Sequence, residues 1–210
     1  MPNWDKELEQ DLKWREAKLI ELKLQAIDAE EDTTRHKALL RALWAMLYAH
    51  YEGFCKFALD TYLDALTELQ PRRIDCKDQI AALSMTNQFR TLRGDLSNEN
   101  CANFIHEFST ILNQTVEFNF QFSTQGNLFP SALLKCYQSV CLPSDPVEDN
   151  QRRLAALVSR RNDIAHGRNV PVRNFKEYEE HEEAAFTVIC GLAIAIIEAL
   201  EQKQYLKAAD

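Results

Sequence analysis

The chain has 210 residues, of which 46% are hydrophobic and only five are glycine, and its net charge is −8. This length predicts one domain, residues 1–210, with a proper hydrophobic core. The acidic balance argues against nonspecific nucleic-acid binding by the protein as a whole. Six cysteines without a Cys-x-x-Cys pair favour reduced core thiols over disulfides. Helix-forming residues dominate, and their apolar members recur at helical spacing, so we expect an all-α fold.

Two segments bear on cellular location. Residues 1–6 lack the basic-then-apolar pattern of a signal peptide. The apolar, uncharged segment from Ala184 to Ile197 is too short to cross a bilayer core of roughly 30 Å. We therefore expect a cytoplasmic protein, without a membrane partner, in which this segment belongs to a buried helix.

The first two predicted helices differ in how much of their surface is apolar. Within residues 1–32, a charged amphipathic helix over 4–27 has a narrow leucine seam that Arg15 interrupts, so it packs on the body or on a second copy. A long helix over 35–69 contains no proline and is apolar on two faces. Such a helix is expected at the centre of a bundle.

Residues 72–146 are expected to form an insertion between the long core helices. Alternating apolar and polar residues within it predict an extended segment or a short strand. In chain order it contains helices over 78–93 and 98–114, the alternating segment over 116–122, a helix over 131–141 and a loop marked by Pro143 and Pro146. Two helices then complete the bundle, over 148–166 and 175–205, and Gly167 is expected to end the first of them.

The most informative stretch is residues 160–167, Arg-Arg-Asn-Asp-Ile-Ala-His-Gly, at the end of a predicted helix. Between Arg152 and Arg173 there are six arginines and one acid, Asp163. Arginine holds phosphate with a planar fork of donors, and histidine titrates near neutral pH. A basic patch on an acidic protein indicates a local anion site, and a solvated arginine face is the alternative.

These residues resemble a known superfamily. The segment from Arg161 to His166 fits the Arg-x(4–6)-His signature of HEPN domains, in which a polar residue commonly follows the arginine. Residues 47–63 (LYAHYEGFCKFALDTYL) are similar to the long second helix of the HEPN branch found in bacterial defence and toxin–antitoxin systems (RiboL-PSP-HEPN-like). Residues 126–142 resemble the segment before the motif in those proteins. The resemblance covers roughly residues 35–200.

The resemblance implies a helical bundle that forms a homodimer, with the two motifs facing each other across a cleft. It also implies a metal-independent endoribonuclease that serves as a toxin or an antiviral effector, alongside an antitoxin or a defence-system partner protein. Some relatives have lost catalysis and bind RNA or partners only. In HEPN toxins controlled by nucleotidyltransferase antitoxins, a modified tyrosine stands two residues after the histidine. Arg168 occupies that position here, so regulation by that modification is not expected.

The expected reaction is attack of an RNA 2′-hydroxyl on the adjacent phosphate, which leaves a 2′,3′-cyclic end. His166 would transfer protons and Arg161 would stabilise charge on the phosphate. On a helix, five residues rotate by about 500°, so these two side chains point about 140° apart. Two symmetric copies would bring both groups to one phosphate, which favours a dimer. Asn162 lies four residues before His166 and is expected to orient the imidazole, as a third catalytic residue.

Other residues are assigned supporting roles. Arg160 is a second candidate for the phosphate, and Glu52 is expected either to pair with an arginine near the cleft or to be an exposed charge. The residues expected to hold the RNA backbone are Arg152, Arg153, Arg168 and Arg173, together with Arg160. The histidines show no metal-ligand spacing, so we expect neither a metal site nor a cofactor.

Two other functions compete with the endoribonuclease. The chain would be a catalytically inactive HEPN module that dimerises and binds RNA or a partner, or a helical scaffold whose arginine patch binds an acidic protein. RNA cleavage distinguishes the endoribonuclease from the inactive module, and RNA binding distinguishes the inactive module from the scaffold.

Overall fold

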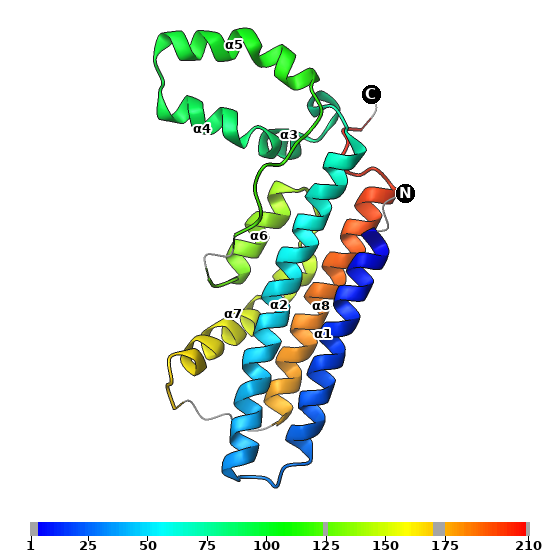
Figure 1. Ribbon diagram of the computed structural model, residues 1–210, viewed down its shortest axis with the longest axis vertical. Coiled ribbons are helices and arrows are strands. Elements are labelled where there is room, and N and C mark those ends of the chain that lie inside the picture. The colour runs from blue at the N-terminus through cyan, green and yellow to red at the C-terminus, as the bar shows by residue number, and fades with distance from the viewer. Residues whose placement is uncertain (1–3, 124–125, 170–174, 209–210) are drawn as a thin grey trace.

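The computed structural model describes residues 4–123, 126–169 and 175–208, and these residues are mainly helical, which confirms the all-α prediction (Figure 1). In chain order the elements are α1 (Trp4–Ile27), α2 (Thr34–Leu69), the 3-10 helix η1 (Arg73–Asp75), α3 (Asp78–Ser84), α4 (Thr86–Gly94), α5 (Asn98–Asn113), α6 (Pro130–Ser139), α7 (Asp145–Ala165) and α8 (Phe175–Glu201).

Helix α2 is the centre of the fold. Helices α1 and α8 lie beside it along the long axis of the molecule, and α7 packs against both α2 and α8 (Figure 1). The two apolar faces of α2 are both buried, with Leu43 and Phe54 on one and Trp44 and Tyr48 on the other. The structure therefore confirms the expected central helix, which the Thr33 side chain caps by accepting from the His36 amide.

Helix α1 packs on α2 and α8 of the same chain, and the break in its leucine seam has a specific reason. Arg15 is buried and forms an ion pair with Asp11 at 2.5 Å. Its guanidinium lies over Gly53 of α2, where a Cβ atom would come within 2.7 Å of Nη1. A cation fits into this helix–helix contact because position 53 has no side chain.

Helix α8 is the one described helix that is long and apolar enough to cross a membrane by length and composition. Half of its most apolar window is buried inside the structure. Val188, Leu192 and Ile196 belong to the buried core, which is the expected environment of a central bundle helix.

The segment 72–146 contains an outlying part and a part that joins the core. Helices α4 and α5 form a hairpin at one end of the molecule, and none of the residues of α4 is buried (Figure 1). The single helix expected over 78–93 is instead two helices that meet at Met85. The hydroxyls of Ser84 and Thr86 donate to the carbonyls of Ala81 and Leu83, and such local hydrogen bonds compete with helix continuation.

The second half of this segment returns to the bundle. Residues 116–122 are extended and form no strand with the described residues, and their alternation is preserved because Val116 is buried while Glu117 is exposed. Helix α6 packs on α7 and contributes Leu133 and Tyr137 to the core. Helix α7 begins at Asp145, earlier than expected, because Pro146 lies in its first turn, where a missing N–H is tolerated.

The contact between α1 and α2 contains a buried histidine that makes the stability of the fold depend on pH. The ring of His50 lies edge-on to Trp14, with 5.3 Å between ring centroids, and neither ring nitrogen has a hydrogen-bond partner among the residues that the structure describes. Burial lowers the pKa of His50 to about 4, and the cation of Arg15 adds to this effect while the carboxylate of Asp11 opposes it. His50 is therefore neutral in the folded protein at neutral pH.

We expect the folded protein to lose stability as the pH falls from 6.5 toward 4, because His50 takes up a proton in the unfolded chain before it does so in the folded one. Between pH 7 and pH 5, His50→Leu should remove on the order of 1–2 kcal/mol of this loss. Urea unfolding at both pH values measures it, with His106→Leu, at an exposed position, as the matched control. An equal loss in wild type and His50→Leu would contradict the prediction.

Candidate functional site

The end of α7 holds the sequence motif in a defined conformation. Gly167 has a φ of +69°, in the left-handed region that suits glycine. Its N–H donates to the Ile164 carbonyl at 3.1 Å, and the Arg168 N–H donates to the Asp163 carbonyl at 2.9 Å. These two bonds form a Schellman cap, which confirms the expected role of Gly167. His166 is the C-cap residue and is exposed, so the helix presents the imidazole at a fixed place on the surface.

Arg161 lies on the opposite side of α7, against α2. Its guanidinium carbon is 4.4 Å from the centre of the Tyr48 ring, the distance of a cation–π contact. Its Nη2 atom is 4.0 Å from a carboxylate oxygen of Glu52, one turn further along α2. The arginine expected to pair with Glu52 is therefore Arg161, and both side chains are largely buried, with 29% and 18% of their surfaces exposed.

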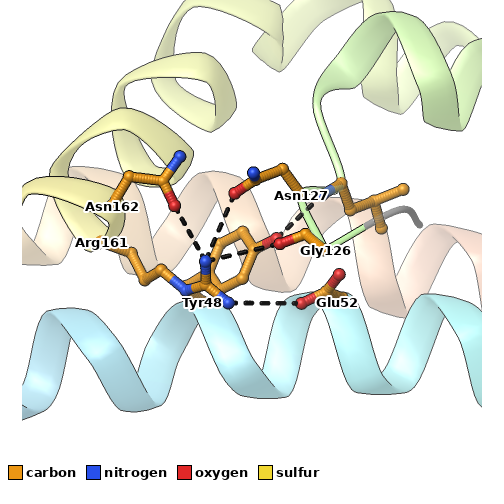
Figure 2. Close-up of polar contacts among 7 residues, drawn as sticks. Tyr48, Glu52, Gly126, Asn127, Arg161 and Asn162 are labelled. Carbon is orange, nitrogen blue, oxygen red and sulfur yellow. Dashed lines mark hydrogen bonds and ion pairs between the residues drawn. The ribbon is translucent and has the colours of Figure 1, made fainter. Parts of the chain in front are cut away.

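The loop before α6 closes over the same guanidinium. Nη1 of Arg161 donates to the Asn162 side-chain oxygen at 2.8 Å, to the Asn127 side-chain oxygen at 3.3 Å and to the Gly126 carbonyl at 3.4 Å (Figure 2). These acceptors come from α7 itself and from a segment 35 positions earlier in the sequence. We call Arg161, Tyr48, Glu52, Asn127 and Asn162 the arginine cluster.

Tyr48 supports the cluster without taking part in proton transfer near neutral pH. Its hydroxyl accepts a hydrogen bond from the Leu128 N–H at 2.8 Å, which ties the loop to α2. Burial raises the pKa of Tyr48 to about 12, although the Leu128 hydrogen bond acts in the opposite direction. The ring is therefore a neutral platform for the arginine.

The position of Asn162 corrects its expected role. Its oxygen accepts from Arg161, and the His166 ring has no hydrogen bond with any residue that the structure describes. Asn162 therefore holds the arginine and does not orient the imidazole. Tyr48 and Glu52 fix the guanidinium of Arg161 on α2, and this position places it beside the side-chain oxygen of Asn162.

Arg160 also differs from its expected role. Its guanidinium lies 4.5 Å from the ring centre of Trp44 and 2.6 Å from Glu177, with 20% of the side chain exposed. These contacts join α7 to α2 and α8. Arg160 is therefore a structural cation, and its burial removes it from the residues that would reach a phosphate at the surface.

The other arginines are distributed along and beyond α7. Arg152 and Arg153 are exposed near the start of the helix, beside Glu148 and Asp149. Arg168 is 71% exposed and forms an ion pair with Asp163 at 2.8 Å. Its carbonyl accepts from Arg41 of α2 at 3.0 Å. Arg173 lies outside the described residues.

Sequence reasoning missed Tyr48 and Asn127 as members of the cluster. Tyr48 has the pattern of a core aromatic on α2, and its spacing of one turn from Glu52 was the available signal. No local pattern connects Asn127 to a residue 34 positions later. Among the described residues, no group of three or more His, Cys, Asp or Glu side chains lies close enough to hold a metal ion.

Comparisons with known proteins identify the family. The family model described as HEPN_MAE_28990:/-like HEPN matches residues 4–205, which is nearly the whole chain. No curated protein and no solved structure matches significantly. The match includes α2, the loop before α6 and the capped motif of α7, which together carry the arginine cluster and His166. The chain therefore belongs to the HEPN_MAE_28990 family and is a domain of the HEPN superfamily.

Proposed function

We propose that this HEPN domain is a metal-independent endoribonuclease that acts on single-stranded RNA in the cytoplasm, as a toxin or an antiviral effector. One observation carries the proposal. The two groups of the motif stand on one capped helix, with Arg161 fixed on α2 and His166 exposed at the helix end. The first supplies a positioned positive charge, and the second supplies an imidazole that can accept and donate a proton.

The proposed reaction is a transesterification. His166 accepts the proton of a 2′-hydroxyl, the 2′-oxygen forms a bond to the adjacent phosphorus, and the bond from phosphorus to the 5′-oxygen breaks. The leaving 5′-oxygen receives a proton from an imidazolium of His166, so the products are a 2′,3′-cyclic phosphate and a 5′-hydroxyl end. Arg161 stabilises the negative charge that develops on the nonbridging oxygens.

The active form is proposed to be a homodimer. Within one chain, no hydrogen bond or ion pair among the described residues joins Arg161 to His166, and the guanidinium lies inward while the imidazole is exposed. A twofold axis near the end of α7 would place the histidine of one protomer beside the arginine of the other. Arg152, Arg153 and Arg168 are proposed to hold the RNA backbone, and an antitoxin or defence partner would act without modifying position 168.

A second candidate function has its own support. The guanidinium of Arg161 already has four protein partners besides the Tyr48 ring, which suits a structural cation in a catalytically inactive HEPN module. Such a module would dimerise and bind RNA or a partner without cleaving it. The carboxylate of Glu52 is 4.0 Å away, however, so Arg161 makes no direct hydrogen bond with it, unlike Arg160 with Glu177.

Purified protein should cleave single-stranded RNA in the presence of EDTA and produce 2′,3′-cyclic phosphate ends. His166→Ala should lower the rate by about 10²–10⁴-fold, because it removes the proton-transfer group. Mass spectrometry of the product ends measures both the reaction and its chemistry. His106→Ala, on the exposed face of α5, is the matched control. Equal cleavage by wild type and His166→Ala would sink the enzyme proposal, and RNA binding without cleavage would support the inactive module.

A heterodimer with Arg161→Ala in one protomer and His166→Ala in the other should retain about half of the wild-type rate. If each site combines residues of both chains, one site of this heterodimer is intact and the other lacks both groups. The heterodimer is isolated with two different affinity tags. Its initial rate is compared with the rates of the Arg161→Ala homodimer and the His166→Ala homodimer, each isolated with the same two tags. A rate no higher than that of the single variants would show that Arg161 and His166 act within one chain.

Asn162→Ala should lower the cleavage rate about tenfold without changing the shape of the pH–rate profile. The reason is that Asn162 contacts the arginine and not the proposed proton-transfer group. Initial rates between pH 5 and pH 9 measure this, with Asn103→Ala as the control at an exposed position of α5. A displaced pH optimum would mean that Asn162 acts on His166 after all.

A further inference from the structure

A cavity of about 450 Å³ lies beside the arginine cluster, between α2, α6 and the loop before α6. The volume falls within the range of about 300–1,000 Å³ typical of small-ligand sites. Its walls combine exposed cations, aromatic rings, hydroxyl groups and an apolar floor. The lining residues that carry the argument are Lys56, Lys135, Phe122, Phe129, Leu59 and Leu128.

The cavity is continuous with the cluster through two residues. Asn127 lines the cavity and also accepts a hydrogen bond from Arg161. Leu128 lines it and also donates its N–H to Tyr48. On the α2 side, Lys56 follows Glu52 by one helical turn, about 6 Å along the axis. A ligand bound here therefore lies next to the guanidinium.

The charged side chains of the cavity are available to an anion. Lys56 and Lys135 are both exposed, and neither forms an ion pair with a residue that the structure describes. Asp60 is one turn beyond Lys56, where its carboxylate accepts the Phe122 N–H at 2.9 Å and also interacts electrostatically with the Lys56 cation. Two exposed lysines that line one cavity favour a ligand with a phosphate.

The interior of the cavity suits a flat ring. Phe129 is 38% exposed, although it lies next to the buried Leu128 and Pro130. Phe122 lies at the other end of the same loop, and Leu59 with Leu128 forms an apolar floor. Aromatic side chains bind nucleobases through their π-faces, whatever the base, and cations follow the backbone.

We propose that this cavity is a nucleotide subsite, which takes one unpaired base of single-stranded RNA while Lys56 and Lys135 hold its phosphate. The inference rests on the proposed function and deepens it, because it places the nucleotide next to the scissile phosphate in a defined cavity. A base inside a duplex is stacked and paired, so the cavity selects unpaired RNA.

The binding test uses a short fluorescent oligonucleotide with 2′-O-methyl riboses, whose blocked 2′-oxygens prevent cleavage. Lys56→Glu and Lys135→Glu should each raise the Kd about tenfold, with a weaker dependence of binding on salt. Lys18→Glu, an equal change of charge at an exposed position of α1, should change the Kd less than twofold. If both cavity variants bind as Lys18→Glu does, the subsite does not exist.

A second pair of measurements tests the base. Phe129→Leu keeps an apolar side chain but removes the ring, and should weaken binding of the single strand and not of a duplex of the same sequence. A photoreactive 4-thiouridine in the oligonucleotide should crosslink to residues 122–136, as mapped by mass spectrometry. Equal effects on single strand and duplex, or crosslinks only outside this segment, would overturn the proposal.

The outcomes separate this inference from the proposed function. If wild type binds the probe through Lys56 and Lys135 but cleaves no RNA, the subsite stands and the nuclease proposal fails. If wild type cleaves RNA and both lysine variants bind and cleave as Lys18→Glu does, the nuclease stands and the subsite fails.

Discussion

The contact of Arg161 with the Tyr48 ring joins the three parts of the molecule that make the candidate site. A guanidinium is planar, so it stacks on an aromatic face and donates hydrogen bonds in its own plane at the same time. The face of the Arg161 guanidinium stacks on the Tyr48 ring of α2, and its edge donates hydrogen bonds to Asn127 and Asn162. This fixes the end of α7 on the central helix, and with it the place at which His166 meets solvent.

The arginines of this acidic chain divide into separate roles because their surroundings differ. Arg160 has the Glu177 carboxylate at 2.6 Å and the Trp44 ring beneath it, so its charge is compensated within the bundle. Arg161 has its carboxylate at 4.0 Å and lies on a neutral Tyr48 ring, and its hydrogen bonds go to neutral oxygens of Gly126, Asn127 and Asn162. Two adjacent residues on a helix point about 100° apart, which places them in different environments.

Local signals in the sequence were sufficient for the elements that carry the motif. The absence of proline and the two apolar faces predicted α2, and the glycine after His166 predicted the capped end of α7. They were insufficient where side chains far apart in sequence decide the outcome. The break at Met85 depends on Ser84, whose hydroxyl also accepts from the buried Arg73. The start of α7 at Asp145 was, in contrast, a local signal that was missed, because Pro146 suits the first turn of a helix as well as a loop.

The sequence by itself determined the helical class, the central helix, the cap at Gly167 and the angular separation of Arg161 from His166, because each follows from helical periodicity or backbone chemistry. Only the tertiary structure decided which arginine faces Glu52, that Asn162 serves the arginine, and that Asn127 closes over it. The physical reason is that a long, flexible cationic side chain contacts the acceptors that lie nearest to it in space. The packing of α2, α7 and the loop before α6 determines which acceptors these are.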